Sequence, residues 1–305
     1  MEMNNPLVSI ITVNYNGLIY TQDFLKSLRA ISYTNIEIFV VDNASSQSIA
    51  PLKTAFPEVT FIESKVNLGF AGGNNLAVMQ AKGKYCLLLN NDTELDPHFL
   101  EPLVQLMESN SAIGICSAKL LYFSDPTLVE FAGSKGVNLY TGRGFAIGHK
   151  DRDAAVYNQS YQTELAHGAA MMISRAVFEK IGLMAELFFL YYEEVDFCER
   201  ANRAGFEIWY CGSSAVYHKE SMSVGKDSPM KIYYLTRNRI IFTRRNTKGF
   251  QKMAALLFFY LISFPKWVLT YILKGQFRLL AAFVKGAMWN VFHYQIYSNT
   301  GLILK

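Results

Sequence analysis

Three acidic side chains stand close together at Glu193, Glu194 and Asp196. Their surroundings predict a helix over residues 193–204, and the positive end of a helix dipole favours ionised carboxylates. A carboxylate held in this way can take a proton from an attacking hydroxyl group. All three are therefore catalytic candidates, with Glu194 the expected base and Glu193 next. Asp196 precedes Arg200 by four residues, so its expected role is mainly a structural ion pair. The alternative is a solvated first turn.

Further polar side chains follow three apolar or β-branched runs, at the points where strands are expected to end. Strands are predicted over residues 8–13, 37–41 and 85–89, and they are followed by Asn14 and Tyr15, by Asp42, and by Asn90-Asn91-Asp92, respectively. In open α/β sheets, ligands bind at the carboxyl ends of the strands. We therefore expect Tyr15, Asp42 and Asp92 to converge in space.

A glycine-rich segment, Asn67-Leu-Gly-Phe-Ala-Gly-Gly-Asn-Asn75, lies between a short predicted strand at residues 60–62 and a predicted helix at residues 74–81. Glycines let a backbone approach a phosphate or sugar closely, and the N–H groups that open a helix can bind an anion. The segment matches neither G-x-G-x-x-G nor a Walker loop. A turn without any ligand is therefore the alternative.

The alternation of strands, turns and helices indicates an α/β fold, with a mostly parallel sheet covered by helices on both faces. Another helix is expected to start at Asp96-Pro97, and one more covers residues 174–180. Residues 124–162 are rich in Gly, Asp, Tyr and Asn. This part is expected to form loops and short strands that cover the edge of the sheet.

Six segments, taken in chain order, share a known pattern. They are Val8-Ser-Ile-Ile-Thr-Val-Asn-Tyr-Asn16, Val41-Asp-Asn-Ala-Ser45, the glycine-rich segment, Leu87-Leu-Leu-Asn-Asn-Asp92, Tyr191-Tyr-Glu-Glu-Val-Asp-Phe-Cys-Glu-Arg200 and Val216-Tyr-His218. Together they resemble glycosyltransferase family 2, and most closely its rhamnosyltransferase-like branch, over residues 7–245. The resemblance implies a nucleotide-sugar-binding GT-A fold, a divalent metal (Mn²⁺ or Mg²⁺) and inversion at the anomeric carbon.

The resemblance also assigns nucleotide contacts. Asp42 would accept a hydrogen bond from the imide N–H of uracil or thymine, and Tyr15 would lie near the base. The other expected nucleotide contacts are Val13, Asn14, Asn67, Gly72, Asn75 and Asn91. The implied donor is a dTDP- or UDP-sugar, with dTDP-rhamnose as the leading one.

For the metal, the resemblance implies Asp92, at the last acid of a D-x-D motif, and His218 as a second protein ligand; Glu194 would be the base. A cation held by hard ligands stabilises the charge that the leaving diphosphate gains, and phosphates and waters complete its coordination. This chain has a single acid in Asn90-Asn91-Asp92, and Glu where the base is often Asp. Residues 167–172 resemble the segment that lines the donor and acceptor pocket.

Charge divides the 305 residues into two regions. All 25 Asp and Glu precede residue 228, whereas twelve of the 29 Lys and Arg follow it. We therefore predict a catalytic domain over residues 1–227 and a basic, apolar helical extension over residues 228–305. Because 51% of the residues are hydrophobic and 18% are charged, apolar surface is expected to remain for a lipid or protein partner.

The C-terminal region is expected to associate with a membrane surface. Its basic residues Arg237, Arg239, Arg244, Arg245, Lys248 and Lys252 would attract anionic lipid head groups. Residues 253–273 are long enough to span a bilayer, but a central Lys266 costs roughly 2.5–3.5 kcal/mol, which favours helices lying in the interface. The alternative is an intramolecular cap or a homodimer interface. Nucleic acid is not an expected partner, because the aromatic residues lie in aliphatic runs.

The expected location follows from the cysteines, and the expected acceptor is what the resemblance to the rhamnosyltransferase-like branch implies. The four cysteines lack C-x-x-C spacing and lie among apolar neighbours, which favours reduced thiols and the cytoplasmic face of the cell membrane. The expected acceptor is a saccharide or lipid-linked saccharide of cell-surface glycan synthesis, and the absence of Q-x-x-R-W favours single addition. Two alternatives stay open. A sugar-1-phosphate nucleotidyltransferase is disfavoured, since Asn14-Tyr-Asn-Gly17 has no basic residue; a non-catalytic membrane-tethered nucleotide-sugar-binding module is the other.

Overall fold

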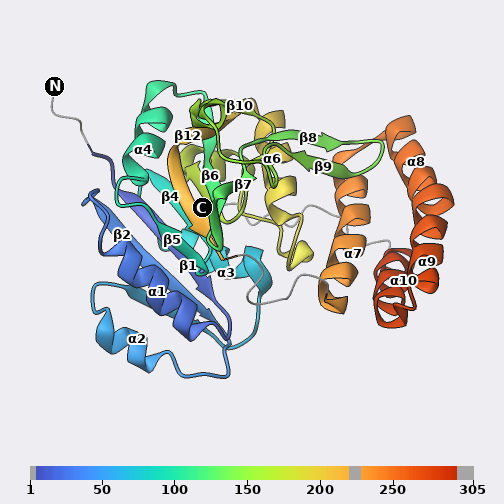
Figure 1. Cartoon of the computed structure of the whole chain (residues 1–305), viewed down its shortest axis with the longest axis horizontal. Coiled ribbons are helices and arrows are strands. Elements are labelled where there is room, and N and C mark those ends of the chain that lie inside the picture. Colours follow the sequence, from blue (N-terminus) through green and yellow to red (C-terminus); the bar gives the residue numbers. More distant parts are fainter. Residues whose placement is uncertain (1–4, 220–227, 294–305) are drawn as a thin grey trace.

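The structure, a computed structural model, describes residues 5–219 and 228–293. Ten strands form one sheet in the order β10-β12-β6-β11-β4-β1-β2-β3, with β5 paired to β12 and β7 paired to β6. Strands β8 and β9 form a separate hairpin. The C-terminal helices α7 to α10 gather at one end of the long axis of the molecule (Figure 1).

The first part of the chain alternates strands with helices. Its elements are β1 (Val8–Asn14), α1 (Leu18–Leu28), β2 (Ile36–Asn43), α2 (Ala50–Ala55), β3 (Thr60–Ser64), α3 (Gly69–Val78) and β4 (Tyr85–Leu89). β1 pairs in parallel with β2 and β4, and β2 pairs in parallel with β3. Aliphatic and β-branched side chains that are buried on both faces make β1, β2 and β4 strands, whereas β3 lies at the edge of the sheet and is only partly buried. All four strands predicted in this part are confirmed.

The rest of the sheet is mixed. Its elements are β5 (Thr93–Leu95), α4 (Leu100–Ser109), β6 (Ile113–Tyr122), β7 (Asp125–Phe131), β8 (Ser134–Asn138), β9 (Arg143–Ala146), η1 (Ala155–Asn158), β10 (Tyr161–Thr163), β11 (Ala170–Ser174), α5 (Arg175–Ile181), η2 (Glu186–Phe188), α6 (Glu193–Arg203) and β12 (Glu207–His218). β12 runs parallel to β6, whereas β11 is antiparallel to β4 and β6. The short strands expected over residues 124–162 are confirmed.

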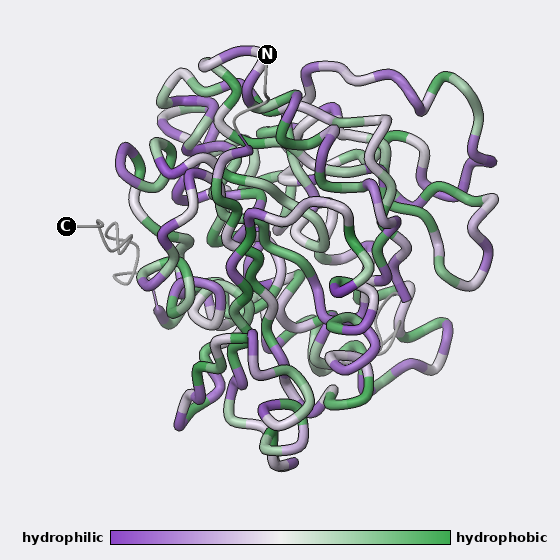
Figure 2. Tube along the Cα trace, turned by 90° about the vertical axis from the view of Figure 1, so that its left-hand side faces the viewer, coloured by the Kyte–Doolittle hydropathy of each residue, from purple (hydrophilic) through white to green (hydrophobic). Residues whose placement is uncertain are grey.

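Helices cover both faces of the sheet because successive side chains of a strand point to opposite faces. Along β1, Val8 and Ile10 join the core that contains α1, α2 and α4, whereas Ile11 joins the core that contains α3, α5 and α6. Apolar stretches run through the middle of the molecule, and hydrophilic stretches are common in its outer loops (Figure 2). The predicted layering is therefore confirmed.

Two predicted helix starts are wrong. The helix expected from residue 74 begins at Gly69, so the glycine-rich segment forms its first turns rather than a turn before it. Gly69 has a φ of 69°, and a Cβ there would lie 2.0 Å from the Phe189 carbonyl oxygen, so only glycine fits. The helix expected from Asp96 begins at Leu100, because the Asp96 side chain closes a turn instead.

The last helices form an apolar unit with a small core of its own. They are α7 (Pro229–Asn246), α8 (Gly249–Leu257), a π-helical turn η3 (Phe258–Ser263), α9 (Phe264–Leu273) and α10 (Phe277–Phe292). Their core is built from Ile240, Phe259, Tyr271, Phe283 and Ala287. Within the described residues, the continuous helix Gly249–Leu273 is long and apolar enough to cross a membrane, and 17% of its most apolar window is buried.

The basic residues of α7 do not form the lipid-facing surface that the sequence predicted. Arg237 and Arg239 are 7% and 9% exposed, and Arg245 is paired with Asp196. Guanidinium groups buried in this way must be satisfied by protein acceptors. The expectation is therefore wrong for these three arginines, and α7 is bonded to the first region of the chain. The domain boundary at residue 228 stays a prediction.

Candidate active site

The ends of β1, β2 and β4 meet in one hydrogen-bond network. The Asn14 amide donates to the Asp42 carboxylate at 2.8 Å and to the Ser45 hydroxyl at 3.1 Å. The Thr21 hydroxyl of α1 donates to the Asn14 side chain and accepts from the Asn91 amide, both at 2.9 Å. Asn14, Asp42 and Asn91 are all buried. The predicted convergence of these strand ends is thus present, and the network forms a rigid floor at the sheet edge.

Tyr15 and Val13 flank Asn14 in the sequence, but Tyr15 is exposed at the surface whereas Val13 is half-buried and packs against the core. Tyr15 is 43% exposed, so its ring surface is accessible to a planar ligand. Val13 packs beneath Gly73 of α3, where a Cβ would lie 3.0 Å from the Val13 methyl groups. The geometry leaves Tyr15 and Asp42 as the nucleotide candidates at this edge and gives Val13 a packing role.

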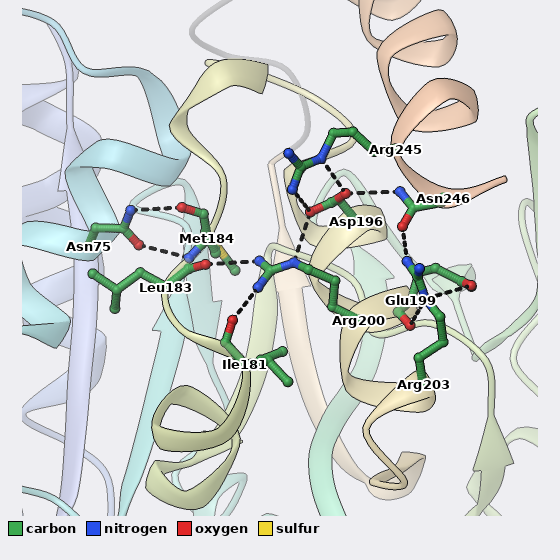
Figure 3. Close-up of polar contacts among 10 residues, drawn as sticks. All are labelled: Asn75, Ile181, Leu183, Met184, Asp196, Glu199, Arg200, Arg203, Arg245 and Asn246. Atoms are coloured by element: carbon green, nitrogen blue, oxygen red, sulfur yellow. Dashed lines mark hydrogen bonds and ion pairs between the residues drawn. The ribbon is translucent and has the colours of Figure 1, made fainter. Parts of the chain in front are cut away.

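The nucleotide contacts predicted in α3 and just before it bond or pack against other parts of the protein. The Asn75 side chain accepts from the Met184 N–H and donates to the Met184 carbonyl (Figure 3). It also donates to the Glu186 carboxylate. The Asn67 side-chain oxygen accepts from the Gly69 N–H at 2.9 Å, and a Cβ on Gly72 would collide with Leu68. The nucleotide role predicted for Asn75 is therefore replaced by a structural one, because its amide is buried and fully bonded.

Asp92 and His218 meet at the same edge. His218 ends β12 and lies opposite Thr93 of β5, which brings His218 Nε2 within 3.2 Å of Asp92 Oδ1. Glu130 of β7 holds the other ring nitrogen, Nδ1, at 2.8 Å. All three side chains are less than 10% exposed. The cluster is therefore one imidazole held between two buried carboxylates.

The two carboxylates make His218 a cation. Burial alone would lower the pKa of His218, but the hydrogen bonds and charges of Asp92 and Glu130 outweigh burial and raise this pKa to about 10. The ring of His167 lies 6.2 Å from that of His218, centroid to centroid. Its pKa is lowered to about 4, chiefly by burial, so His167 is neutral at physiological pH.

These residues fit a divalent cation. His218 Nε2 and Asp92 Oδ1 face each other at 3.2 Å, and both atoms are of the kind that binds a divalent cation once the imidazole nitrogen is free of its proton. Glu130 would orient the imidazole through Nδ1, as carboxylates behind metal-bound histidines do. Within residues 5–219 and 228–293, no group of three or more His, Cys, Asp and Glu is arranged to hold a metal. Of the described residues, Asp92 and His218 are the two candidate ligands, and diphosphate and water would supply the others.

Glu193 and Glu194 open α6, as predicted. Glu193 is 3% exposed, and one of its carboxylate oxygens has no hydrogen-bond partner among the described residues; Glu194 is half-buried. Burial raises the pKa of both carboxyl groups, and the nearby charge of Glu194 adds to the rise at Glu193. A carboxylate with a raised pKa accepts a proton more readily than an exposed one, as a general base must.

Glu194 is connected to the Asp92–His218 pair through residues 167–168. A Cβ on Gly168 would lie 3.8 Å from the Cβ of Glu194. The preceding residue, His167, turns its ring edge toward that of His218. The acidic pair of α6 and the Asp92–His218 pair therefore border the same short segment, which the sequence analysis expected to line the pocket.

Asp196 differs from its two acidic neighbours. Figure 3 shows its carboxylate enclosed by Arg200, Arg245 and Asn246, with 3.0 Å to each guanidinium Nε and 2.9 Å to the amide. Burial opposes ionisation, but Arg245 and Arg200 outweigh it and hold the pKa of Asp196 below its ordinary value. The predicted ion pair with Arg200 is confirmed. A carboxylate neutralised by two arginines is not a base, so the catalytic candidacy of Asp196 is wrong.

Sequence analysis missed Thr21, Ser45 and Glu130. Thr21 and Ser45 join the hydrogen-bond network only because the strand ends converge, and nothing in the sequence around them assigns either residue this role. Glu130 had one usable signal, since it stands as a lone acid between Val129 and Phe131 in an apolar run. A buried acid in such a run needs a partner, and His218 is that partner.

Comparison with known proteins agrees with this geometry. The family model described as "Glycosyl transferase family 2" matches residues 9–182, more than half of the chain. The chain is 30% identical over 241 residues to the low-salt glycan biosynthesis hexosyltransferase Agl10 of Haloferax volcanii, covering 77% of this chain and 74% of that protein. It is 27% identical to the uncharacterized glycosyltransferase RP339 of Rickettsia prowazekii, covering 60% of this chain and about half (54%) of that protein.

Solved structures show the same fold. A mannosyltransferase from Pyrobaculum calidifontis, in complex with GDP-Man and Mn²⁺, is similar over 96% of this chain and 89% of its own, with a TM-score of 0.60 and 13% identity. TarS residues 1–349 from S. aureus, in complex with UDP-GlcNAc, is similar over 92% of this chain and 81% of its own, with a TM-score of 0.56 and 18% identity. At these identities the likeness concerns the fold alone.

Proposed function

The chain belongs to glycosyl transferase family 2 and has the GT-A fold, and from this premise we propose that it is an inverting, metal-dependent hexosyltransferase. One observation carries the proposal: the Asp92–His218 pair and the Glu193–Glu194 pair border the same segment at one edge of the sheet. This arrangement supports the proposal, because a single displacement requires a group that stabilises the leaving diphosphate close to a group that accepts a proton. Family membership also favours transfer over the sugar-1-phosphate nucleotidyltransferase alternative.

In the proposed reaction an acceptor hydroxyl oxygen attacks the anomeric carbon and its proton passes to Glu194. The bond between that carbon and the diphosphate oxygen breaks, and its electron pair leaves with the nucleotide diphosphate. Attack from the side opposite to the leaving group inverts the anomeric centre. A divalent cation, when bound, would stabilise the negative charge of the leaving group. Asp92 and His218 would hold it, and Glu130 would keep His218 in orientation.

The donor we propose is a dTDP- or UDP-sugar, with dTDP-rhamnose first. Asp42 is buried at the floor of the site with a carboxylate oxygen 3.2 Å from the Ser45 N–H, and it can accept from a pyrimidine imide. Tyr15 offers an accessible ring beside it. We propose a saccharide or lipid-linked saccharide of cell-surface glycan synthesis as acceptor.

A thermal-shift screen tests the proposal most directly. With Mn²⁺ present, dTDP-rhamnose or a UDP-sugar is expected to stabilise the chain by about 2.7 kcal/mol at a hundred times Kd, whereas GDP-mannose is not. The stabilisation is expected to disappear when EDTA replaces Mn²⁺, because the diphosphate is held through the cation. If no nucleotide sugar shifts the melting temperature, or if EDTA leaves the shift intact, the proposed metal-dependent transferase is wrong.

We propose further that α8 to α10 bind a membrane surface, at its cytoplasmic face because the four cysteines favour a reducing compartment. Large apolar side chains along α8, η3 and α9 are 46–76% exposed: Phe250, Met253, Leu257, Leu261, Ile262, Leu269, Ile272 and Leu273. The exposed cations Lys266, Lys274, Arg278 and Lys285 accompany them. An apolar stripe with cations and no acid is typical of a helix lying at an anionic lipid surface.

Vesicle flotation tests this surface. The protein is expected to float with vesicles that contain phosphatidylglycerol, and Leu261→Glu is expected to weaken flotation at least about tenfold, because a charge on the stripe opposes burial in lipid. Val156→Glu is the matched control, since Val156 is similarly exposed (62% against 69%) but lies on η1. A wild-type protein that stays with the unbound fraction would refute membrane binding. If Leu261→Glu instead splits a dimer in light scattering, the stripe is a homodimer interface.

A further inference from the structure

The segment that leads into the acidic pair has an unusual backbone. Within residues 187–192, Phe189, Tyr191 and Tyr192 have φ angles of 66°, 68° and 75°. Bulky non-glycine residues rarely adopt this left-handed region, and they persist there only where the surroundings hold them. Tyr192 is the residue directly before Glu193, so this backbone sets the direction in which α6 starts.

The buried side chain of Asn238 on α7 holds this segment. Asn238 is 0% exposed, and its amide nitrogen lies 2.9, 2.8 and 2.7 Å from the carbonyl oxygens of Phe188, Leu190 and Tyr191. The neighbouring Arg237 orients this amide, because its Nε donates to the Asn238 side-chain oxygen at 2.8 Å. Arg237 also donates to the Phe188 carbonyl at 2.9 Å. Apart from the bond between Arg237 and Asn238, each of these bonds joins α7 to a main-chain carbonyl of the segment.

The same segment also contacts the first turn of α3. The Phe189 carbonyl accepts from the Phe70 N–H of α3 at 2.7 Å, and Gly69 leaves the room for that contact. The Tyr192 carbonyl accepts from the Asp196 N–H at 2.8 Å and so begins the bonding of α6. The segment therefore joins α3, α6 and α7 through its main chain.

We propose that Asn238 is a positioning residue that fixes the first turn of α6, and with it the base, by holding the carbonyl groups of Phe188, Leu190 and Tyr191. This inference rests on the proposed function where it concerns Glu194. The three carbonyls converge on the Asn238 amide, which in the proposed reaction would touch neither the donor nor the acceptor. Helix α7, which the sequence assigns to a membrane extension, is by this inference part of the catalytic framework.

An apolar side chain would not replace this amide. Removing it leaves the three carbonyl groups without this donor in a buried place, and the segment is expected to relieve this cost by turning toward more ordinary φ angles. A movement of the first turn of α6 by about 1 Å lowers turnover on the order of 100-fold when a base must be aligned. Binding of the nucleotide depends on other elements and is expected to change less than about threefold.

The experiment compares Asn238→Ala and the isosteric Asn238→Asp with Asn290→Ala. Asn290 on α10 is equally buried, and its amide donates to the carbonyls of Arg237 and Gly286, so Asn290→Ala loosens the contact between α10 and α7 while leaving the Asn238 amide in place. Amide hydrogen exchange of residues 187–196 is expected to rise at least about tenfold in both Asn238 variants, but not in Asn290→Ala. This readout requires no substrate.

Turnover of dTDP-rhamnose, measured as release of dTDP per dTDP-binding site, is the second readout. Both Asn238 variants are expected to lose kcat while keeping their affinity for dTDP, and Asn290→Ala is expected to keep both. Unchanged exchange in the Asn238 variants would overturn the inference. So would equal losses of kcat in Asn290→Ala, since general loosening of α7 would then explain them. A wild-type protein without turnover would count against the proposed function, and hydrogen exchange would still test whether Asn238 holds residues 188–191.

Discussion

Replacing Asp92 with Ala is expected to lower kcat/KM for sugar transfer on the order of 10³-fold, which corresponds to about 4 kcal/mol of lost transition-state stabilisation. Asp92 is the one carboxylate of the strand-end motif, and it faces His218 Nε2 at 3.2 Å in a buried place. Without it the site keeps a single ligand from the proposed pair, so the charge developing on the leaving diphosphate is poorly compensated.

A binding measurement separates this effect from misfolding. Electron paramagnetic resonance of Mn²⁺ in the presence of UDP is expected to show Mn²⁺ binding at least about tenfold weaker in Asp92→Ala than in the wild type. Asp96→Ala is the matched control, because Asp96 lies four residues farther on and only closes a turn with His98. Equal Mn²⁺ affinity in Asp92→Ala and the wild type would remove Asp92 from the metal site.

The sequence predicted the sheet edge because the relevant information is local. Residues 85–89 are apolar throughout and residues 8–13 are mainly β-branched and aliphatic, which marks strands buried on both faces. Once strands are parallel, their carboxyl ends must share one edge. The prediction that Tyr15, Asp42 and Asp92 converge therefore followed from spacing and residue type alone, and the structure joins these three strand ends through Asn14, Asp42 and Asn91.

Roles that depend on packing could not be predicted in this way. Asn75 looks like a phosphate contact in the sequence, but its amide is used by Met184, a residue 109 positions away. The arginines of α7 look like a lipid-binding patch because composition gives the sign of a charge but not its burial. Arg245 proves to be the partner of Asp196, 49 residues earlier.

The second large effect is expected from Glu194→Gln, which keeps the shape of the side chain but removes its ability to accept a proton. Turnover is expected to fall 10²- to 10⁴-fold, the usual share of a general base. Burial raises the pKa of Glu194. A base works only when deprotonated, so the wild-type rate is expected to rise with pH through this raised pKa, and that limb of the profile should vanish in the variant.

The comparison that decides between the acids uses residues of the same helix. Glu199→Gln is the control, since Glu199 is a carboxylate of α6 that pairs with Arg203, and it should retain wild-type turnover and pH dependence. Glu193→Gln is expected to lose less than Glu194→Gln, because the Glu193 side chain is only 3% exposed and an acceptor has less access to it. If the order of the two losses is reversed, Glu193 is the base. Full activity in both variants would mean that the acceptor proton leaves by a route that does not involve α6, and the proposed role of its acidic pair would have to be abandoned.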